Sequence, residues 1–212
     1  VSSKLPDRFR NFFLPVQDHG YLEPDAAFAY MDGDILRMLT SSQNVFHDRR
    51  IIARALGLPL DKIQVQAATV GGGFGGKDGH INQVFAALVT LKTGKPAKIV
   101  FDRTEVFIGT YKRHAADIHI KFGFTQDGFF KAFEGKAWLD TGAYAGLGPA
   151  VMGLFSEHFG GPYQIPNVKL DVYLAYTNKP PAHAMRGFGA PQGAFATETL
   201  ISRAARQLGI DP

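Results

Sequence analysis

Two glycine-rich loops are the parts of the sequence best suited to chemistry. The first, GGGFGGKDG, covers residues 71–79, and the second, RGFGAPQG, covers residues 186–193. Each loop lies between a predicted strand and a predicted helix, and each places glycines around one phenylalanine. Glycine allows positive φ angles and lets backbone N–H groups approach a ligand closely, and the N-terminus of a helix favours an anion. Two loops of this kind in one chain predict an oxygen-rich or phosphate-bearing ligand.

The first loop also has nearly the spacing of an ATP-binding P-loop. Gly71 is followed after four residues by Gly76 and Lys77, but Asp78 occupies the position where a P-loop has Ser or Thr. A carboxylate there would repel a phosphate, and the bulky Phe74 suits a tight phosphate loop poorly. A nucleotide (ATP)-binding module that uses this loop remains one alternative function, and a scaffold domain without a cofactor remains another.

The composition limits the classes of protein that come into question. The chain has 212 residues, of which 45% are hydrophobic and 20% charged, as in ordinary folded proteins. Because cysteine is absent, disulfides, thiolate zinc sites and iron–sulfur ligation by this chain are excluded. No apolar run approaches the roughly 20 residues of a membrane helix, and the first ten residues lack the apolar core of a signal peptide. The net charge of +4 is scattered, so we expect a cytoplasmic protein without nucleic-acid or membrane partners.

The hydrophobic pattern predicts an α+β fold, with mixed sheets and crossover helices that hold the loops. The Pro- and Phe-rich start of the chain shows no obvious strand or helix. The helix after the first loop should bury one apolar face, formed by Ile81, Val84, Phe85, Leu88 and Leu91. Hairpins are expected at 26–41 and 116–144, strands at 62–70, 97–103 and 169–178, helices at 42–59, 81–93 and 191–208, and a loop or short helix at 142–162.

Six short motifs then carry a family resemblance. They are QDHGYLEP at 17–24, SSQN at 41–44, GGGFGGKD at 71–78, DRTE at 102–105, YQIPN at 163–167 and MRGFGAPQ at 185–192. Each is weak alone, but together and in this order the sequence resembles the molybdenum hydroxylases, the xanthine dehydrogenase and aldehyde oxidase family. The resemblance runs from about residue 12 to residue 212. It implies that residues 1–212 form the first molybdopterin-binding domain of a longer large subunit, so we expect the chain to be a fragment.

The resemblance implies a set of residues around a molybdenum–molybdopterin cofactor. Gln43 matches the glutamine whose amide hydrogen-bonds the oxo group of the metal, and Phe74 matches the residue whose backbone N–H faces the metal and pterin. Arg186 contributes main-chain contact from the second loop. These three residues would surround the molybdenum without ligating it. The full set of expected cofactor-binding residues is Gln43, Gly72, Gly73, Phe74, Gly75, Arg186 and Gly187.

The resemblance also implies two residues that face the substrate. Asp78 matches a carboxylate position that is Glu in purine-oxidising members, and Phe188 matches an aromatic residue that packs against a planar substrate. A substrate-orienting Arg of the purine enzymes would fall near Leu154, which cannot donate a hydrogen bond. Both departures argue against xanthine and leave an N-heterocyclic, aromatic or aldehyde substrate, which such an oxidoreductase hydroxylates with water.

The remaining expectations concern parts that this chain does not contain. No catalytic residue is expected within it, because the general base of the family is a Glu that would lie beyond Pro212. The resemblance implies a second molybdopterin-binding half, with 2Fe–2S clusters and FAD on partner chains or domains, and it leaves open the cytosine dinucleotide form of the cofactor. We therefore expect the fragment alone to be inactive. Its seven histidines have no metal-ligand spacing, although His80, two residues after Asp78, lies beside the predicted substrate position.

Overall fold

The computed structural model describes residues 10–79 and 81–212 and divides into two compact units. Unit 1 comprises residues up to Gln17, Arg113–His183 and Gly187–Pro212, and unit 2 comprises Asp18–Lys112 and Ala184–Arg186. Each unit has its own four-stranded mixed sheet and its own hydrophobic core. The predicted α+β class is confirmed.

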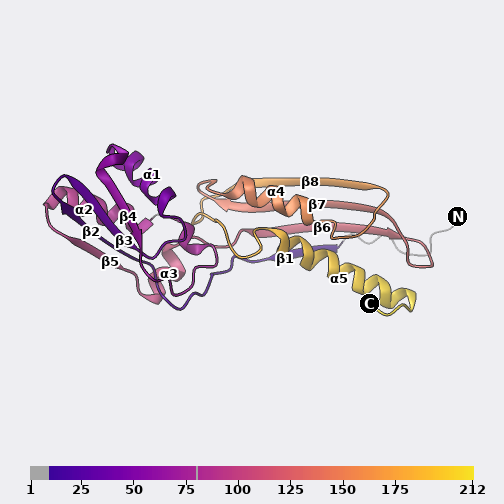
Figure 1. Cartoon of the computed structure of the whole chain (residues 1–212). Helices are drawn as coiled ribbons and strands as arrows, with labels where there is room; N and C mark the ends of the chain where they lie inside the picture. Colours follow the sequence, from indigo (N-terminus) through magenta and orange to yellow (C-terminus); the bar gives the residue numbers. More distant parts are fainter. Residues whose placement is uncertain (1–9, 80) are drawn as a thin grey trace. The chain divides into compact units, whose positions relative to one another are not determined.

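Unit 2 is built on a sheet with the strand order β4-β3-β2-β5. The strands β2 (Ala26–Asp32) and β3 (Ile35–Thr40) form the predicted hairpin, β4 (Ile63–Ala67) runs parallel to β3, and β5 (Ala97–Val100) runs antiparallel to β2. Figure 1 shows α1 (Val45–Leu56) and α2 (Ile81–Thr93) on one face of the sheet. This face buries alternate apolar side chains against the two helices. A short helix, α3 (Arg103–Gly109), and the 3₁₀ turns at Leu60–Lys62 and Gly76–Asp78 complete the unit.

The helix ends in unit 2 follow from their sequences. The side chain of Asn44 accepts a hydrogen bond from the N–H of His47 and so begins α1, and Gly57 ends it with φ of 66°. Asp102 and Glu105 of the DRTE motif accept each other's backbone N–H groups in a capping box that begins α3. This motif therefore has a local structural role.

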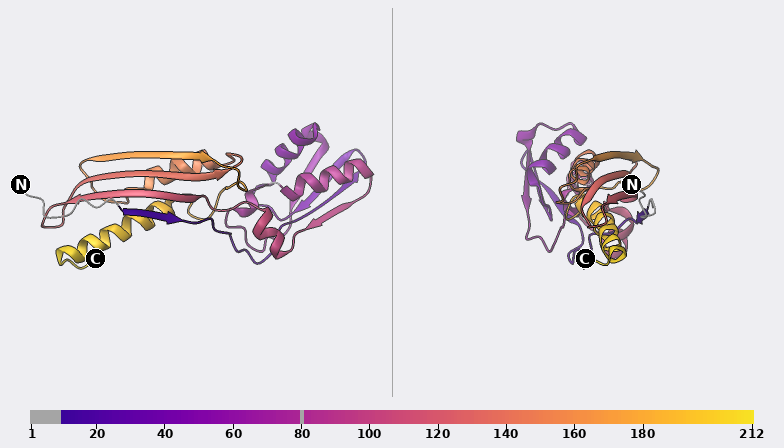
Figure 2. Two further views of the ribbon diagram at one scale, coloured as in Figure 1. Left: turned by 180° about the vertical axis from the view of Figure 1, so that it is seen from behind. Right: turned by 90° about the vertical axis from the view of Figure 1, so that its right-hand side faces the viewer.

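Unit 1 is built on a sheet with the strand order β1-β6-β7-β8. The long hairpin is confirmed as β6 (Ala115–Phe124) and β7 (Phe130–Gly142), and β8 (Val168–Tyr176) runs parallel to β7. The connection between these parallel strands contains α4 (Gly148–His158), which packs on the sheet beside α5 (Ala190–Leu208), as Figure 2 shows from behind. Phenylalanines at positions 133, 155 and 159 fill the core between the sheet and these helices.

Two sequence expectations were wrong. The chain forms a strand, β1 (Arg10–Leu14), where no element was expected, and this strand pairs with β6. The helix α2 does not bury its most apolar face, because Phe85 and Leu88 are exposed while Ala86, Ala87 and Thr90 pack on the sheet. Small side chains allow the helix to approach β2 closely, where the hydroxyl of Thr90 donates to the carbonyl of Ala29 at 3.1 Å. Within the described residues, no helix is long and apolar enough to cross a membrane.

Candidate functional site

The first glycine loop contains a tight reversal of the backbone centred on Phe74 and Gly75. Their φ angles are 50° and 99°, and the N–H of Gly76 donates to the carbonyl of Gly73 at 2.8 Å. A positive φ is uncommon for a residue with a side chain, so Phe74 is held there by the surrounding structure. A Cβ on Gly75 would lie 2.7 Å from the carbonyl oxygen of Ala184, which leaves room for glycine alone.

The second glycine loop, in unit 1, repeats this backbone geometry. Phe188 and Gly189 have φ angles of 51° and 102°, and the N–H of Ala190 donates to the carbonyl of Gly187 at 3.0 Å. Gly187, with φ of 86°, precedes the reversal, and α5 follows it directly. The similar sequences of the two loops therefore form the same type of turn in the structure.

The side chain of Gln43 is bound to the first loop. Its Oε1 accepts hydrogen bonds from the N–H groups of Gly75 at 2.9 Å and Lys77 at 3.3 Å, and its own backbone N–H donates to the carbonyl of Lys77 at 3.0 Å. A Cβ on Gly73 would collide with this amide. Since Oε1 is used in this way, the donor nitrogen Nε2 is the part of the side chain left for a ligand.

Residues 184–186 pack against the same loop within unit 2. The N–H of Arg186 donates to the carbonyl of Phe74 at 2.8 Å, and Nε2 of His19 bonds the carbonyl of Ala184 at 2.7 Å. Unit 2 thus brings together Gln43, Phe74 and Arg186, the three residues expected around the metal.

Lys77 points away from the loop and into unit 2. Its side chain is 0% exposed, and Nζ forms an ion pair with Glu23 at 2.5 Å and lies 4.8 Å from the centre of the Tyr21 ring. A P-loop lysine must instead reach the phosphates that the loop surrounds. The ATP-binding alternative was therefore wrong: the spacing is present, but the lysine faces the protein interior.

The groups around Lys77 form a polar cluster in which Lys77 and Tyr21 are buried and Glu23 is partly exposed. Burial, followed by a hydrogen bond to Asp25, raises the pKa of the Tyr21 hydroxyl. Burial alone would raise the pKa of Glu23, but hydrogen bonds from Lys77 and from the N–H of Gly71 outweigh it and lower that pKa. Glu23 is therefore ionised, and Tyr21 neutral, at neutral pH.

The two expected substrate residues belong to different units. Asp78 ends the 3₁₀ turn Gly76–Asp78 in unit 2 and is partly buried. In unit 1, Phe188 is partly buried, and Leu154 lies on α4, where its carbonyl bonds Nδ1 of His158 at 2.9 Å. Their roles toward a substrate stay predictions. His80 lies outside the described residues.

The first loop fits a ligand that carries hydrogen-bond acceptors. Among the described residues, neither the N–H of Phe74 nor Nε2 of Gln43 meets a protein acceptor. Both groups sit on exposed residues, and the backbone around them is fixed by the hydrogen bonds above. Oxygen and nitrogen atoms of a metal-bound oxo group or a pterin are acceptors of the required kind. Within the described part of the chain, no cluster of three His, Cys, Asp or Glu residues could hold a metal ion directly.

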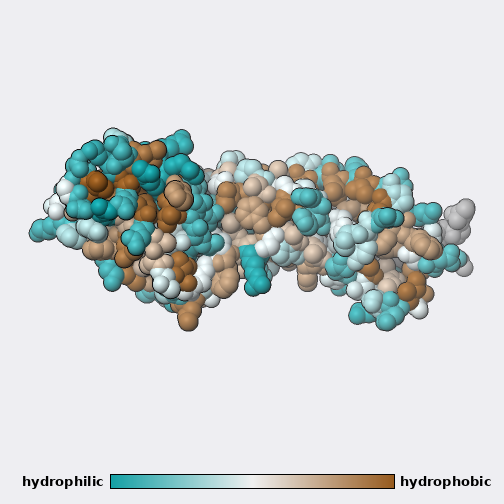
Figure 3. Space-filling view, in the orientation of Figure 1, coloured by the Kyte–Doolittle hydropathy of each residue, from teal (hydrophilic) through white to brown (hydrophobic). Residues whose placement is uncertain are grey.

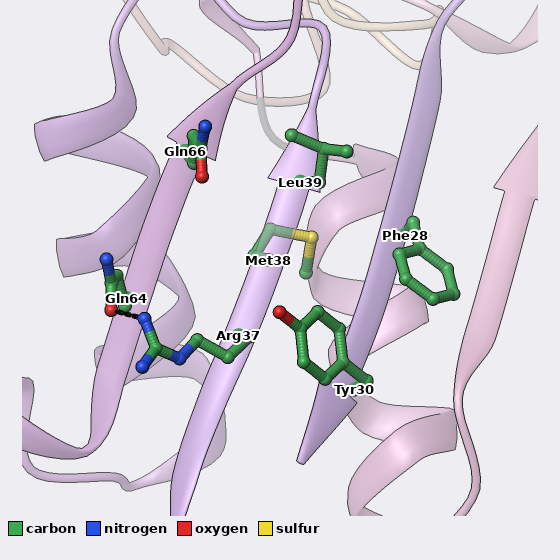
Figure 4. A pocket seen from close by; sticks show the side chains of 7 residues that line it. All are labelled: Phe28, Tyr30, Arg37, Met38, Leu39, Gln64 and Gln66. Atoms are coloured by element: carbon green, nitrogen blue, oxygen red, sulfur yellow. Dashed lines mark hydrogen bonds between the residues drawn. The ribbon is translucent and has the colours of Figure 1, made fainter. Parts of the chain in front are cut away.

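Three hollows among the described residues lie away from the glycine loops. One, of about 400 Å³, lies on the open face of the unit 2 sheet and is shown in Figure 4. Arg37 on β3 donates there to Gln64 on β4, and the aromatic rings of Phe28 and Tyr30 line the other side. Figure 3 shows apolar residues mixed with hydrophilic ones on the visible surface of unit 2. The residues that line this hollow include no carboxylate and no histidine.

Sequence reasoning assigned no role to Glu23 and only a contact at a helix start to Gln192, and the structure makes both residues important. Glu23, in the QDHGYLEP motif, binds both ends of the first loop, as its contacts with Gly71 and Lys77 show. Gln192, in the second loop, is fully buried in unit 1, where its amide donates to the carbonyl of His114 at 3.2 Å and accepts from Arg113 at 3.2 Å. The signal for both was a polar residue inside a recognised motif.

Comparison with known proteins identifies the class to which this fold and site belong. The profile of the family described as molybdopterin cofactor-binding domain matches residues 9–212. The chain therefore belongs to the family of molybdopterin cofactor-binding domains, in agreement with the resemblance carried by its six motifs.

The chain is also similar to individual proteins with molybdopterin-binding or oxidoreductase names. The chain is 43% identical over 195 residues to the nicotinate dehydrogenase large molybdopterin subunit of Eubacterium barkeri, covering 92% of this chain and 46% of that protein. It is 42% identical to a probable xanthine dehydrogenase subunit of Bacillus subtilis, covering 94% of this chain and 27% of that protein. The aldehyde oxidoreductase of Desulfovibrio gigas superposes with a TM-score of 0.93 at 31% identity, covering 99% of this chain and 23% of that one. The chain thus spans less than half the length of these relatives.

Proposed function

We propose that this chain holds the molybdenum cofactor in the large subunit of a molybdenum hydroxylase. The observation that supports this most directly is the pair of unmatched donors, Nε2 of Gln43 and the N–H of Phe74, on a loop whose backbone is otherwise held by hydrogen bonds within the described residues. When bound, the molybdenum cofactor would supply the redox chemistry of a hydroxylation that takes its oxygen from water.

The residues of this chain would bind and orient rather than transfer protons. Gln43 and Phe74 would donate hydrogen bonds to the cofactor, and the main chain of Arg186 and Gly187 would add contacts. Gly72, Gly73 and Gly75 would let the backbone approach the cofactor. They also let the loop pack against Tyr21, Gln43 and Ala184, since an added Cβ at each would lie close to those residues. The reaction's general base would come from a Glu outside this sequence.

The substrate class follows from two positions and stays a proposal. Asp78 reaches less far than the Glu of purine-oxidising enzymes by one methylene, and Leu154 cannot replace an Arg that donates hydrogen bonds. Phe188 would pack its face or edge against a planar ring. We infer an N-heterocyclic, aromatic or aldehyde substrate, and the nicotinate relative is the one whose named substrate fits this best.

The partners are proposed on the same basis. Two of the relatives are named as subunits of larger dehydrogenases. We propose a second molybdopterin-binding half, 2Fe–2S and FAD groups on partner chains or domains that carry electrons away, and the cytosine dinucleotide form of the cofactor. The domain boundary at 1–212 and the cytoplasmic location stay predictions.

The decisive experiment compares two substitutions of Gln43 in the holoenzyme that carries this domain. Gln43→Glu keeps Oε1 for the N–H groups of Gly75 and Lys77 but removes the Nε2 donor, whereas Gln43→Ala removes both. We expect molybdenum content or activity to fall about 10–100-fold in both variants. Gln66→Ala, on the exposed side of β4, is the matched control and should leave both unchanged. A wild-type enzyme without molybdenum or pterin would instead favour the scaffold alternative.

A further inference from the structure

We propose that Glu23 and Lys77 are positioning residues that fix the first glycine loop, and with it the donors of Gln43 and Phe74, in the geometry that the cofactor requires. This inference rests on the function proposed above. Lys77 occupies the position of a P-loop lysine but makes none of the proposed cofactor contacts, so its buried side chain had no role until now.

The carboxylate of Glu23 joins the two ends of the loop. Its Oε2 accepts from the backbone N–H of Gly71 at 2.6 Å and from Nζ of Lys77 at 2.5 Å, and the N–H of Glu23 donates to the carbonyl of Gly71 at 3.1 Å. One carboxylate oxygen therefore binds the first residue of the loop, Gly71, and Lys77 near its other end. Hydrogen bonds between charged groups are shorter and stronger than neutral ones, which makes this oxygen an effective anchor.

Lys77 links this anchor to Gln43. Its side chain binds Glu23, while its backbone N–H and carbonyl bind the side chain and backbone of Gln43 at 3.3 and 3.0 Å. A displacement of Lys77 would therefore move the amide of Gln43, and the neighbouring Gly75 N–H bonded to the same Oε1 would move with it. The side chain that faces away from the ligand thus controls the side chain that faces it.

The surroundings leave Lys77 little freedom to adopt another position. Its side chain is 0% exposed and lies over the ring of Tyr21, which is itself fully buried. Gly76 packs so closely that an added Cβ would lie 2.7 Å from that ring. The pair is asymmetric, because Glu23 retains 33% exposure and can be hydrated without its partner, whereas Lys77 cannot.

This asymmetry separates a positioning role from a purely structural one. Glu23→Gln takes away the carboxylate charge bonded to the buried ammonium of Lys77 and should lower the unfolding temperature most. Lys77→Met leaves a carboxylate that water can reach, and the double variant leaves neither charge, so both should unfold closer to wild type. Glu23→Gln keeps an amide oxygen that can still accept from Gly71 and Lys77, whereas Lys77→Met and the double variant remove the Nζ donor and with it the link between Gly71 and Lys77. If the pair positions the loop, the double variant therefore loses the cofactor geometry although its stability recovers.

The test measures stability and cofactor geometry separately in the holoenzyme. We expect Lys77→Met and the double variant to remain folded, while molybdenum per protein or kcat per bound molybdenum falls about 10–100-fold and the Mo(V) electron paramagnetic resonance spectrum shifts. The exposed pair Lys62–Asp34 in the same unit is the matched control, and Lys62→Met should change neither property. If Glu23→Gln does not accumulate, Lys77→Met and the double variant still decide the question.

The outcomes are distinct. A wild-type holoenzyme that contains molybdenum, together with a stable double variant of unchanged molybdenum content, kcat and spectrum, would overturn the positioning role and leave the proposed function standing. A wild-type holoenzyme without molybdenum would overturn the proposed function, and this inference with it.

Discussion

Gly75→Ala is the substitution whose effect the structure defines most fully. Gly75 has φ of 99°, and an added Cβ would lie 2.7 Å from the carbonyl oxygen of Ala184 and 3.1 Å from Cα of Met185. Both of these neighbours are backbone atoms, so they cannot rotate away as the end of a side chain could. The loop must therefore shift as a whole, or the segment 184–186 must move.

Two contributions add to the expected loss. A non-glycine residue in the left-handed region costs about 1–2 kcal/mol, and forcing extra atoms into a packed site costs about 1–3 kcal/mol. Together they predict that Gly75→Ala lowers the free energy of unfolding of unit 2 by about 2–5 kcal/mol. Gly57→Ala is the matched control, because Gly57 has φ of 66° but nothing lies within 4 Å of an added Cβ. It should show the conformational part alone, about 1–2 kcal/mol.

Urea denaturation followed by circular dichroism measures the difference. With a urea dependence of about 1–3 kcal/mol per molar, the midpoint of Gly75→Ala should lie about 1 M below that of Gly57→Ala. The fluorescence of Trp138, the one tryptophan in the sequence, reports on unit 1 and serves as an internal reference. Equal midpoints for the two alanine variants would refute the claim that residues 184–186 press directly on the loop.

Three further outcomes concern stability. Lys112→Met should lower the free energy of unfolding by about 3–5 kcal/mol, since Nζ bonds the carbonyls of Val106 in α3 and Thr110 after it, and its loss leaves the largely buried Asp18 without its ion-pair partner. A change no larger than that of an exposed lysine variant would contradict this. Burial lowers the pKa of His114 from 6.5 to about 4, so the folded protein keeps this ring neutral at pH values where the unfolded chain protonates it. The free energy of unfolding should therefore fall by about 3 kcal/mol as the pH falls from 6.5 toward 4. His114→Gln should therefore have urea midpoints that fall less between pH 7 and pH 4 than those of wild type, and parallel curves would count against it. Asp102→Ala should cost about 1 kcal/mol by breaking the capping box of α3, whereas Glu105→Gln, which can still accept the N–H of Asp102, should cost less when both are measured by urea denaturation.

The elements that sequence reasoning predicted well are those with strong local signals. The hairpin of β2 and β3 turns where Gly33 takes a positive φ, and α1 ends at Gly57 for the same reason. The long hairpin of β6 and β7 also follows from its turn residues and alternating pattern. These signals act within a few residues, so the sequence contains them in readable form.

The errors arose where tertiary contacts outweighed local pattern. Apolar spacing in α2 favoured a face with Phe85 and Leu88, but the sheet accepts the small residues Ala86 and Ala87, which allow closer packing. The strand β1 has no periodic signal of its own and exists because β6 offers a partner edge. Neither competing effect can be read from a window of sequence.

The candidate site shows the same division. Glycine content located both loops, but spacing could not show that Phe74 and Phe188 take positive φ angles in the same turn. The spacing also suggested that Lys77 binds phosphate. This was misleading, because spacing does not specify on which side of a loop a side chain lies. The direction of Lys77 is set by Glu23 and Tyr21, which lie more than fifty residues earlier in the chain.

Motifs that are separate in sequence therefore form one hydrogen-bonded network in unit 2. Glu23 comes from QDHGYLEP, Gln43 from SSQN and Lys77 from GGGFGGKD, and the guanidinium of Arg103, from DRTE, donates to the carbonyl of Tyr21 at 2.6 Å. No member of this set is apolar, and each is bonded to a residue of another motif or to that motif's backbone. Lys77 is the buried member of this network, and removing a partner of a buried polar group leaves that group unsatisfied. This explains why four individually weak motifs together made a specific prediction: they are four parts of the single structure that holds the first glycine loop.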